Sequence, residues 1–188
     1  MTLPVNMIAV DRYWLITCTT YGTWLPGDHR GFVGSALDEN EKLVNHNQPF
    51  TPAALPNPKL ESAIVHGLKC PPIVFQANHA EVLFKQFEET TRIRQWLLIA
   101  VAIMRTHFHI VIGVPDDPDP EKIRGDLKAY GSRCLNRAYT KPASDTWWSD
   151  GGSNRKLPDE NAVEAAVNYV RQQSNPLLIW TRETGRLI

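Results

Sequence analysis

The chain has 188 residues, 43% of them hydrophobic, and equal numbers of acidic and basic side chains, so its formal net charge is zero. This length and apolar content suffice for one well-buried domain and argue against two full domains, so we expect a single domain over residues 1–188. A net charge of zero argues against a protein that coats nucleic acid without sequence preference, because such proteins carry a large basic excess.

Three widely spaced cysteines form no Cys-x-x-Cys pair and so give no indication of a disulfide framework or a thiolate zinc site. The N-terminus has no basic segment before its apolar residues, and no apolar stretch of the chain is long enough to span a bilayer. We therefore expect a cytoplasmic protein that has no membrane partner.

Aromatic and β-branched residues over 12–25 predict a first strand that breaks near Gly22. The following segment, 26–72, is rich in Gly, Pro and Asn, which predicts a long loop insertion with at most a short helix near 59–67. Long ordered loops often carry function.

Apolar residues then recur at helical spacing over 77–94, which predicts a helix. Residues 96–104 and 107–114 are apolar and flank Arg105-Thr106, which predicts two antiparallel strands in a tight hairpin or one bent strand. A proline in the first turn predicts the start of an amphipathic, basic helix over 120–139.

Residues 147–157 predict an edge strand or a turn around Gly151-Gly152. Trp147 and Trp148 either stack on bases or are buried, and we expect at least one of them to be buried. Asp159 is expected to cap a last helix over 160–173. This order of elements predicts an α+β fold in which helices pack on an antiparallel sheet.

The second strand of the hairpin opens with His107-Phe108-His109. Side chains alternate along a strand, so the two histidines share one face and Phe108 lies on the other. Tyr169 and Gln173 stand four residues apart on the last predicted helix and share a face of it. Two neutral imidazoles and an amide oxygen can hold a divalent cation and leave positions open for a substrate, which predicts a catalytic metal site.

A tyrosine hydroxyl is a poor nucleophile because its free pKa is about 10, so covalent attack by Tyr169 needs assistance. A cation at the histidine pair would polarise a phosphate and help to orient the attacking phenol. Tyr130 is a competing nucleophile on the basic helix, but its place in the apolar stripe of that helix predicts core packing instead.

The pattern Met104-x-x-His-x-His109, followed by Tyr169-Val-x-x-Gln173, resembles the single-tyrosine HUH transposases. That family includes an insertion-sequence type and the REP-associated tyrosine transposases of bacteria. The resemblance runs from the first strand to about residue 176. The Gln four residues after the tyrosine is typical of the insertion-sequence branch, whereas the Asn-Pro at 175–176 stands two residues later than in REP-associated members.

The resemblance implies a ferredoxin-like palm with His107, His109 and Gln173 as the ligands of Mg²⁺ or Mn²⁺. It also implies that Tyr169 nicks and rejoins single-stranded DNA at hairpin-bearing sites through a 5′-phosphotyrosine, leaving a free 3′-OH. The expected partner is therefore single-stranded DNA with hairpin structure. A monomer and a homodimer are both compatible with the sequence.

Residues 121–156 hold eight Lys or Arg against four Asp or Glu, a local excess of +4 that suits a site-specific DNA-binding protein. The segment Leu127–Arg133 resembles the family's basic helix, which packs beside the DNA. The candidate phosphate contacts are Lys128, Arg133, Arg155 and Lys156.

The insertion over 26–72 is longer than the family core needs, and it is either a DNA-reading loop or a surface insertion. Within it, His29 and Arg30 either contact a phosphate or lie in a solvent-exposed turn, and we expect the turn.

Two other functions fit the sequence. A relative that kept the fold and lost cleavage would bind hairpin DNA without forming a covalent adduct. A small-molecule metal hydrolase with the same histidines would use water as its nucleophile and would need neither Tyr169 nor DNA. The basic helix over 120–139 argues against the hydrolase.

Overall fold

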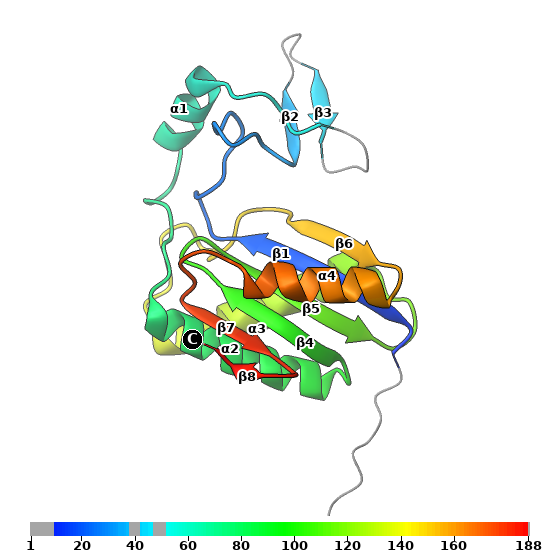
Figure 1. The fold of residues 1–188 in the computed structure, drawn as a ribbon. Helices are drawn as coiled ribbons and strands as arrows, with labels where there is room; N and C mark the ends of the chain where they lie inside the picture. The colour runs from blue at the N-terminus through cyan, green and yellow to red at the C-terminus, as the bar shows by residue number, and fades with distance from the viewer. Residues whose placement is uncertain (1–9, 38–41, 47–51, 188) are drawn as a thin grey trace, which may run out of the picture.

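A six-stranded antiparallel sheet in the order β6-β1-β5-β4-β7-β8 forms the centre of the fold (Figure 1). The computed structural model describes residues 10–37, 42–46 and 52–187, so the expectation for the N-terminal end falls outside the described residues. The strands of this sheet are β1 (Arg12–Thr19), β4 (Leu97–Ile103), β5 (His107–Val114), β6 (Ser153–Leu157), β7 (Leu178–Thr181) and β8 (Gly185–Arg186).

Helices cover both faces of the sheet (Figure 1). The covering helices are α2 (Ala77–Ile93) and α3 (Pro120–Ala138) on one face and α4 (Glu160–Arg171) on the other, whereas α1 (Pro58–His66) lies apart from the sheet. The chain order β1-α2-β4-β5-α3-β6, with the sheet order β6-β1-β5-β4, is the ferredoxin-like arrangement. The expected α+β, ferredoxin-like palm is therefore confirmed.

Alternation along the central strands divides the core into two layers. Phe108, Ile110 and Ile112 of β5 belong to the larger layer, in which α2 and α3 pack on the sheet. Val111 belongs to the smaller layer, which also contains Val170 of α4. The histidines of β5 alternate with Phe108, so they lie on the α4 side of the sheet.

The hairpin between β4 and β5 closes through a turn at Arg105-Thr106, as expected. The backbone N–H of Met104 donates to the carbonyl of His107 across this turn, at 2.8 Å. Residues Ile103 and Phe108 are then directly paired, and the ladder continues toward Leu97 with one irregularity after Leu98. This pairing fixes the position of His107 at the first residue of β5.

The helices α3 and α4, which follow the hairpin in the chain, each have an aspartate as the N-terminal cap. Asp119 precedes Pro120, and its carboxylate accepts from the backbone N–H of Glu121 at 2.9 Å. Asp159 accepts from the N–H of Ala162 at 2.8 Å and so caps α4 as predicted. Both helices begin where the sequence indicates.

The insertion over 26–72 holds more regular structure than expected. Besides α1 it contains β2 (Ser35–Leu37) and β3 (Leu43–Asn45), which form a separate two-stranded antiparallel sheet. The expectation of at most a short helix is therefore wrong. Residues 38–41 and 47–51 of this segment lie outside the described residues. Figure 1 shows the insertion beyond the end of the sheet at which β1 ends and β5 begins.

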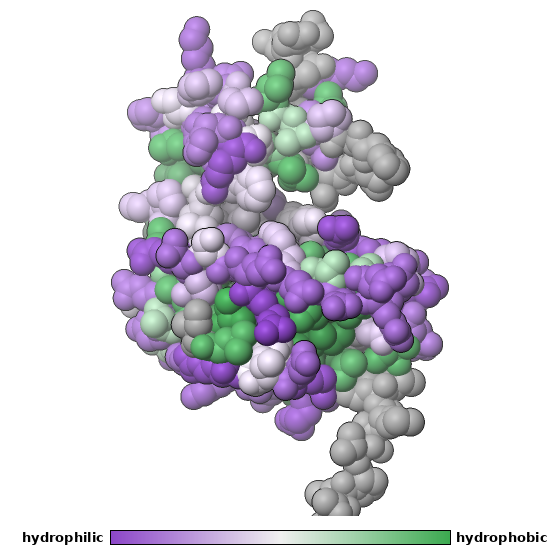
Figure 2. Space-filling model, in the orientation of Figure 1, coloured by the Kyte–Doolittle hydropathy of each residue, from purple (hydrophilic) through white to green (hydrophobic). Residues whose placement is uncertain are grey.

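A second unexpected feature is the C-terminal hairpin of β7 and β8, which extends the sheet next to β4. Leu178 and Ile179 of β7 are buried, one in each layer of the core. On the opposite face from α2 and α3, α4 covers only part of the widened sheet, and hydrophobic side chains stay visible beside it (Figure 2). No helix among the described residues combines the length and the apolar character needed to cross a membrane.

Candidate active site

His107 and His109 lie together on the α4 side of β5. Their ring centroids are 4.8 Å apart, and the rings are nearly perpendicular. His109 is buried and His107 is partly buried. Strand alternation brings the two imidazoles to one face, and the buried Phe108 between them anchors the strand from the other side.

Each imidazole has a threonine hydroxyl beside its Nδ1 atom. Thr17 of β1 lies opposite His109 in the sheet, and its Oγ1 is 2.8 Å from His109 Nδ1. Thr106 of the hairpin turn places its Oγ1 3.0 Å from His107 Nδ1. When Nδ1 carries the proton and donates to the hydroxyl, Nε2 presents its lone pair, which is how histidines commonly bind metal ions.

Both imidazoles are neutral near pH 7. Burial lowers the pKa of His109 to about 3, and the proximity of His107 adds to this effect. Burial also lowers the pKa of His107 to about 4, with a further contribution from the positive charge of Arg30. A metal ligand must be unprotonated, so these environments suit cation binding.

Tyr169 lies on α4 and reaches the histidine pair from above the sheet. Its hydroxyl is 3.4 Å from Nε2 of His109, and the two ring centroids are 5.0 Å apart. Tyr169 is 47% exposed, whereas the next residue, Val170, is fully buried and holds the helix on the sheet. The phenol is therefore both anchored by its helix and accessible to a large substrate.

Gln173 lies just beyond α4, which ends at Arg171 instead of continuing to residue 173 as expected. The helix stops because Gln172 forms the cap and the chain turns at Asn175, whose φ is 54°. The side chain of Gln173 folds back, and its Nε2 donates to the carbonyl of Tyr169 at 3.1 Å. This contact keeps Gln173 beside Tyr169 and leaves the amide oxygen as a possible ligand.

The donor set fits a divalent cation. The described residues contain no group of three or more His, Cys, Asp or Glu side chains that could hold a metal ion. A cation bound at the histidine pair would therefore need a donor of another type, and the amide oxygen of Gln173 is the one that the sequence predicts. Two neutral imidazoles and one amide oxygen leave coordination positions for a phosphate, as a catalytic site requires.

The four predicted DNA contacts are distributed over both faces of the sheet. Arg155 is exposed on β6 and pairs in register with Leu15, whose side chain lies in the layer under α4. Arg155 therefore shares its face with the histidines. Lys156 pairs with Trp14, which packs in the layer under α2 and α3, so Lys156 is directed to the opposite face.

The other two predicted contacts belong to α3, on the face away from the histidines. The Lys128 ammonium donates to the backbone carbonyls of Ser149 and Gly151, at 2.7 and 2.5 Å. Arg133 is exposed and stacks over the ring of Tyr130, with 5.0 Å between the guanidinium carbon and the ring centroid. The structure thus gives Lys128 a contact within the protein and places Arg133 far from Tyr169.

Trp147 and Trp148, in the loop before β6, are both buried, and the sequence predicts burial of at least one of them. Trp147 donates its indole N–H to Asn136, and Trp148 donates to Ser132 and to the carbonyl of Lys128. These residues connect the loop before β6 to α3, and their rings are not available to stack on bases.

Sequence reasoning missed the two threonines beside the histidines, and it assigned Arg30 to a solvent-exposed turn. No sequence pattern marks Thr17 or Thr106 as a partner of a histidine, because the strand register and the hairpin turn place their hydroxyls beside the rings. Arg30 had a signal in the spacing Asp28-His29-Arg30 between two glycines, which is typical of a tight turn closed by an ion pair.

Comparison with known proteins gives one family. Residues 59–173 match the sequence model of the family described as "Transposase IS200 like". This segment covers more than half of the chain and includes both histidines, Tyr169 and Gln173. No curated protein matches the sequence.

Two solved structures are similar to this chain at low sequence identity. One is a REP-associated tyrosine transposase bound to a REP hairpin, with 10% identity, a TM-score of 0.46, and coverage of 90% of this chain and 70% of that one. The other is a protein of Deinococcus radiodurans R1 assigned as a transposase, with 14% identity, a TM-score of 0.44, and coverage of 93% and 99%.

Proposed function

This chain belongs to the IS200-like transposase family, and we propose that it nicks and rejoins single-stranded DNA through Tyr169. The observation that carries the proposal is the position of the Tyr169 hydroxyl, 3.4 Å from Nε2 of His109. The candidate nucleophile Tyr169 and the candidate metal ligand His109 are sixty residues apart in the sequence, and the fold brings them together where the phenol is accessible to solvent.

In the proposed cleavage step, the phenol oxygen of Tyr169 attacks the phosphorus of one phosphodiester. The bond between phosphorus and the 3′ oxygen breaks, and its electron pair leaves with that oxygen. The phenol releases its proton to water, and the departing oxygen takes up a proton as a free 3′-OH. The 5′ phosphate stays on Tyr169 as a phosphodiester, which conserves the bond energy for rejoining by the reverse reaction.

Two threonines beside the histidines hold the imidazole rings in position for this step. Thr17 and Thr106 orient the two rings through Nδ1, and the burial of His109 keeps its ring neutral. A bound Mg²⁺ or Mn²⁺, held by His107, His109 and Gln173, would act as a Lewis acid that stabilises charge on the phosphate oxygens.

The proposed substrate is single-stranded DNA with a hairpin near the cleavage site. The exposed position of Tyr169 on α4 leaves its hydroxyl open to the backbone of a bound strand. Arg155 lies on the same face and is the predicted phosphate contact that we retain for the strand beyond the site.

The test uses the purified chain with Mn²⁺ and single-stranded hairpin DNA taken from the flanks of its own gene. DNA labelled at its 3′ end should give a protein-linked band on a denaturing gel, and DNA labelled at its 5′ end should give a shorter free fragment. Tyr169→Phe should abolish both products. Tyr130→Phe is the matched control and should keep them, because Tyr130 lies on α3 on the opposite face.

Other outcomes would identify the alternative functions. Tight hairpin binding without any adduct would indicate a DNA-binding protein that has lost cleavage. Hydrolysis that continues in Tyr169→Phe would indicate a metal hydrolase with water as its nucleophile.

A further inference from the structure

Residues 23–32, which connect β1 to the insertion and include its first residues, form a closed loop next to the histidine pair. It lies outside the segment matched by the family, which begins at residue 59. Trp24 donates its indole N–H to the carbonyl of Gly31 at 2.7 Å and so ties the two ends of the loop together. Gly27 has a φ of 93°, and an added Cβ there would lie 2.4 Å from the carbonyl oxygen of Asn57.

Within this loop, Asp28 fixes the side chain of Arg30. The Asp28 side chain is only 6% exposed, whereas that of Arg30 is 48% exposed. Oδ1 of Asp28 accepts from the Nε and from the backbone N–H of Arg30, at 2.8 and 2.9 Å, and Oδ2 accepts from Nη2. The same hydrogen bonding lowers the pKa of Asp28 and raises that of Arg30, so the pair stays ionised.

Two further contacts hold the guanidinium in place. Its Nη2 also donates to the carbonyl of Thr23 at 2.9 Å. The ring of Trp24 lies against it, with 5.3 Å from the guanidinium carbon to the ring centroid. An arginine side chain held in this way has already lost most of the conformational freedom that ligand binding would otherwise restrict.

One nitrogen of Arg30 is left for a ligand. A guanidinium has five N–H donors, and the contacts above use the single donor of Nε and both donors of Nη2. Nη1 has no hydrogen-bond partner among the described residues. It therefore offers two charged N–H groups at a half-exposed position.

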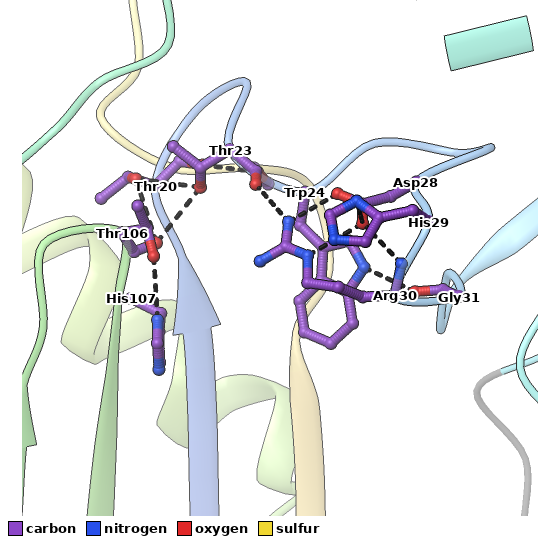
Figure 3. Close-up of polar contacts among 10 residues, drawn as sticks. Thr20, Thr23, Trp24, Asp28, His29, Arg30, Gly31, Thr106 and His107 are labelled. Atoms are coloured by element: carbon purple, nitrogen blue, oxygen red, sulfur yellow. Dashed lines mark hydrogen bonds and ion pairs between the residues drawn. The ribbon is translucent and has the colours of Figure 1, made fainter. Parts of the chain in front are cut away.

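A chain of polar contacts connects this guanidinium to the histidines (Figure 3). The hydroxyl oxygen of Thr23 lies 2.8 Å from the carbonyl oxygen of Thr20 and 3.2 Å from that of Thr106, and the hydroxyl of Thr106 lies 3.0 Å from Nδ1 of His107. The hydroxyl oxygen of the buried Thr20 lies 2.6 Å from the carbonyl oxygen of Ile73 and 3.0 Å from that of Thr106.

We propose that Arg30 binds a phosphate oxygen of the DNA strand at the active site through Nη1, and that Asp28 is the residue that positions it. This inference rests on the proposed function, because it needs a strand to be held at the histidines and Tyr169. It changes the expectation that Arg30 lies in a merely solvent-exposed turn.

The occupied donors favour a phosphate over a base. Bidentate recognition of guanine needs two parallel N–H groups on adjacent nitrogens. The edge formed by Nε and Nη2 is taken by Asp28, and the other edge is half-occupied by the carbonyl of Thr23. A phosphate oxygen can accept from Nη1 alone.

The test measures DNA binding separately from cleavage. The Tyr169→Phe protein, which should not cleave, is titrated against a fluorescent single-stranded hairpin at several KCl concentrations. Adding Arg30→Gln should weaken binding roughly tenfold and reduce the slope of log Kd against log salt by about 0.7, the value for one phosphate of a single strand. An unchanged affinity and slope would overturn the proposal.

Arg92→Gln is the matched control. Arg92 is an exposed arginine on α2, so this change removes the same charge from the face opposite the histidines. It should leave the slope unchanged. A thermal melt of each variant checks that the fold persists, and Arg30→Lys, which keeps the charge, should recover part of the salt slope.

A double-mutant comparison tests whether Asp28 acts by positioning Arg30. Asp28→Asn alone should reduce the salt slope, and adding it to Arg30→Gln should produce no further loss, because both changes remove the same contact. Additive losses would show that Asp28 does not act through Arg30.

The two proposals fail in different ways. If the wild-type protein forms no adduct while Arg30→Gln still reduces the salt slope, the nuclease proposal fails and the phosphate contact stands. If the adduct forms and Arg30→Gln changes neither affinity nor slope, the phosphate contact fails and the nuclease proposal stands.

Discussion

Thr17 lies directly across the sheet from His109, and its hydroxyl is 2.8 Å from Nδ1 of that ring. The contact joins β1, which precedes the segment matched by the family, to the strand that carries the histidines. The orientation of His109, and with it the direction of Nε2 toward Tyr169, therefore depends on a residue ninety-two positions away in the chain.

Thr17→Val should weaken cation binding. Valine has nearly the same shape, so the strand should be retained, but the ring loses the group that fixes its orientation. Loss of the hydrogen-bond partner of a metal-binding histidine commonly lowers the affinity for the metal about 10- to 100-fold. Titration calorimetry with Mn²⁺ measures the change. Thr181→Val, which removes a buried hydroxyl of β7 bonded to Thr184, is the control and should bind Mn²⁺ as the wild type does.

Gln173→Ala should also lower the affinity for Mn²⁺, by at least roughly tenfold, if its amide oxygen is a ligand. Gln173→Glu keeps an oxygen donor at the same position and should retain binding. Gln172→Ala changes the exposed neighbouring residue and should have no effect. If Gln173→Ala binds Mn²⁺ like the wild type, another donor completes the histidine pair.

Removal of divalent cations should stop adduct formation without unfolding the protein. The core layers on both faces of the sheet are apolar and need no ion for their packing. EDTA should therefore abolish the covalent product while the circular dichroism spectrum is preserved, and added Mn²⁺ should restore the product. Adduct formation that persists in EDTA, or in His109→Ala, would exclude a role for metal at these residues.

Asp159→Ala tests the support of the nucleophile's helix. The carboxylate caps the first turn of α4, and loss of such a cap costs about 1 kcal/mol in the free energy of unfolding. Urea denaturation measures this change. Glu164→Ala, on the exposed side of the same helix, should change stability by less than about 0.5 kcal/mol. Equal effects of the two substitutions would argue against the cap.

Much of the fold follows from local patterns in the sequence. The alternation around Phe108 predicts which face of β5 carries the histidines, and Asp119 and Asp159 mark the starts of α3 and α4. These signals lie within a few residues of the feature they predict, so no knowledge of the tertiary structure is needed.

The rest depends on contacts between distant segments. The short strands β7 and β8 lack a long periodic pattern and are stabilised by pairing beside β4. Lys128 looks like a free cation in the sequence, but its ammonium meets carbonyls of the loop at 149–151 only after that loop has packed on α3. In the same way, the placement of Arg30 beside His107 follows from the return of the insertion to the end of the sheet.

The central claim is that Tyr169 forms the covalent bond to DNA, and mass spectrometry of the digested adduct tests it most directly. After treatment with nuclease and trypsin, the peptide from Leu157 to Arg171 contains Tyr169 as its single tyrosine. The account predicts that this peptide carries the mass of a 5′-linked nucleotide remnant. A remnant on the peptide that contains Tyr130, or none on any tyrosine peptide of a reaction that has cleaved the DNA, would contradict it.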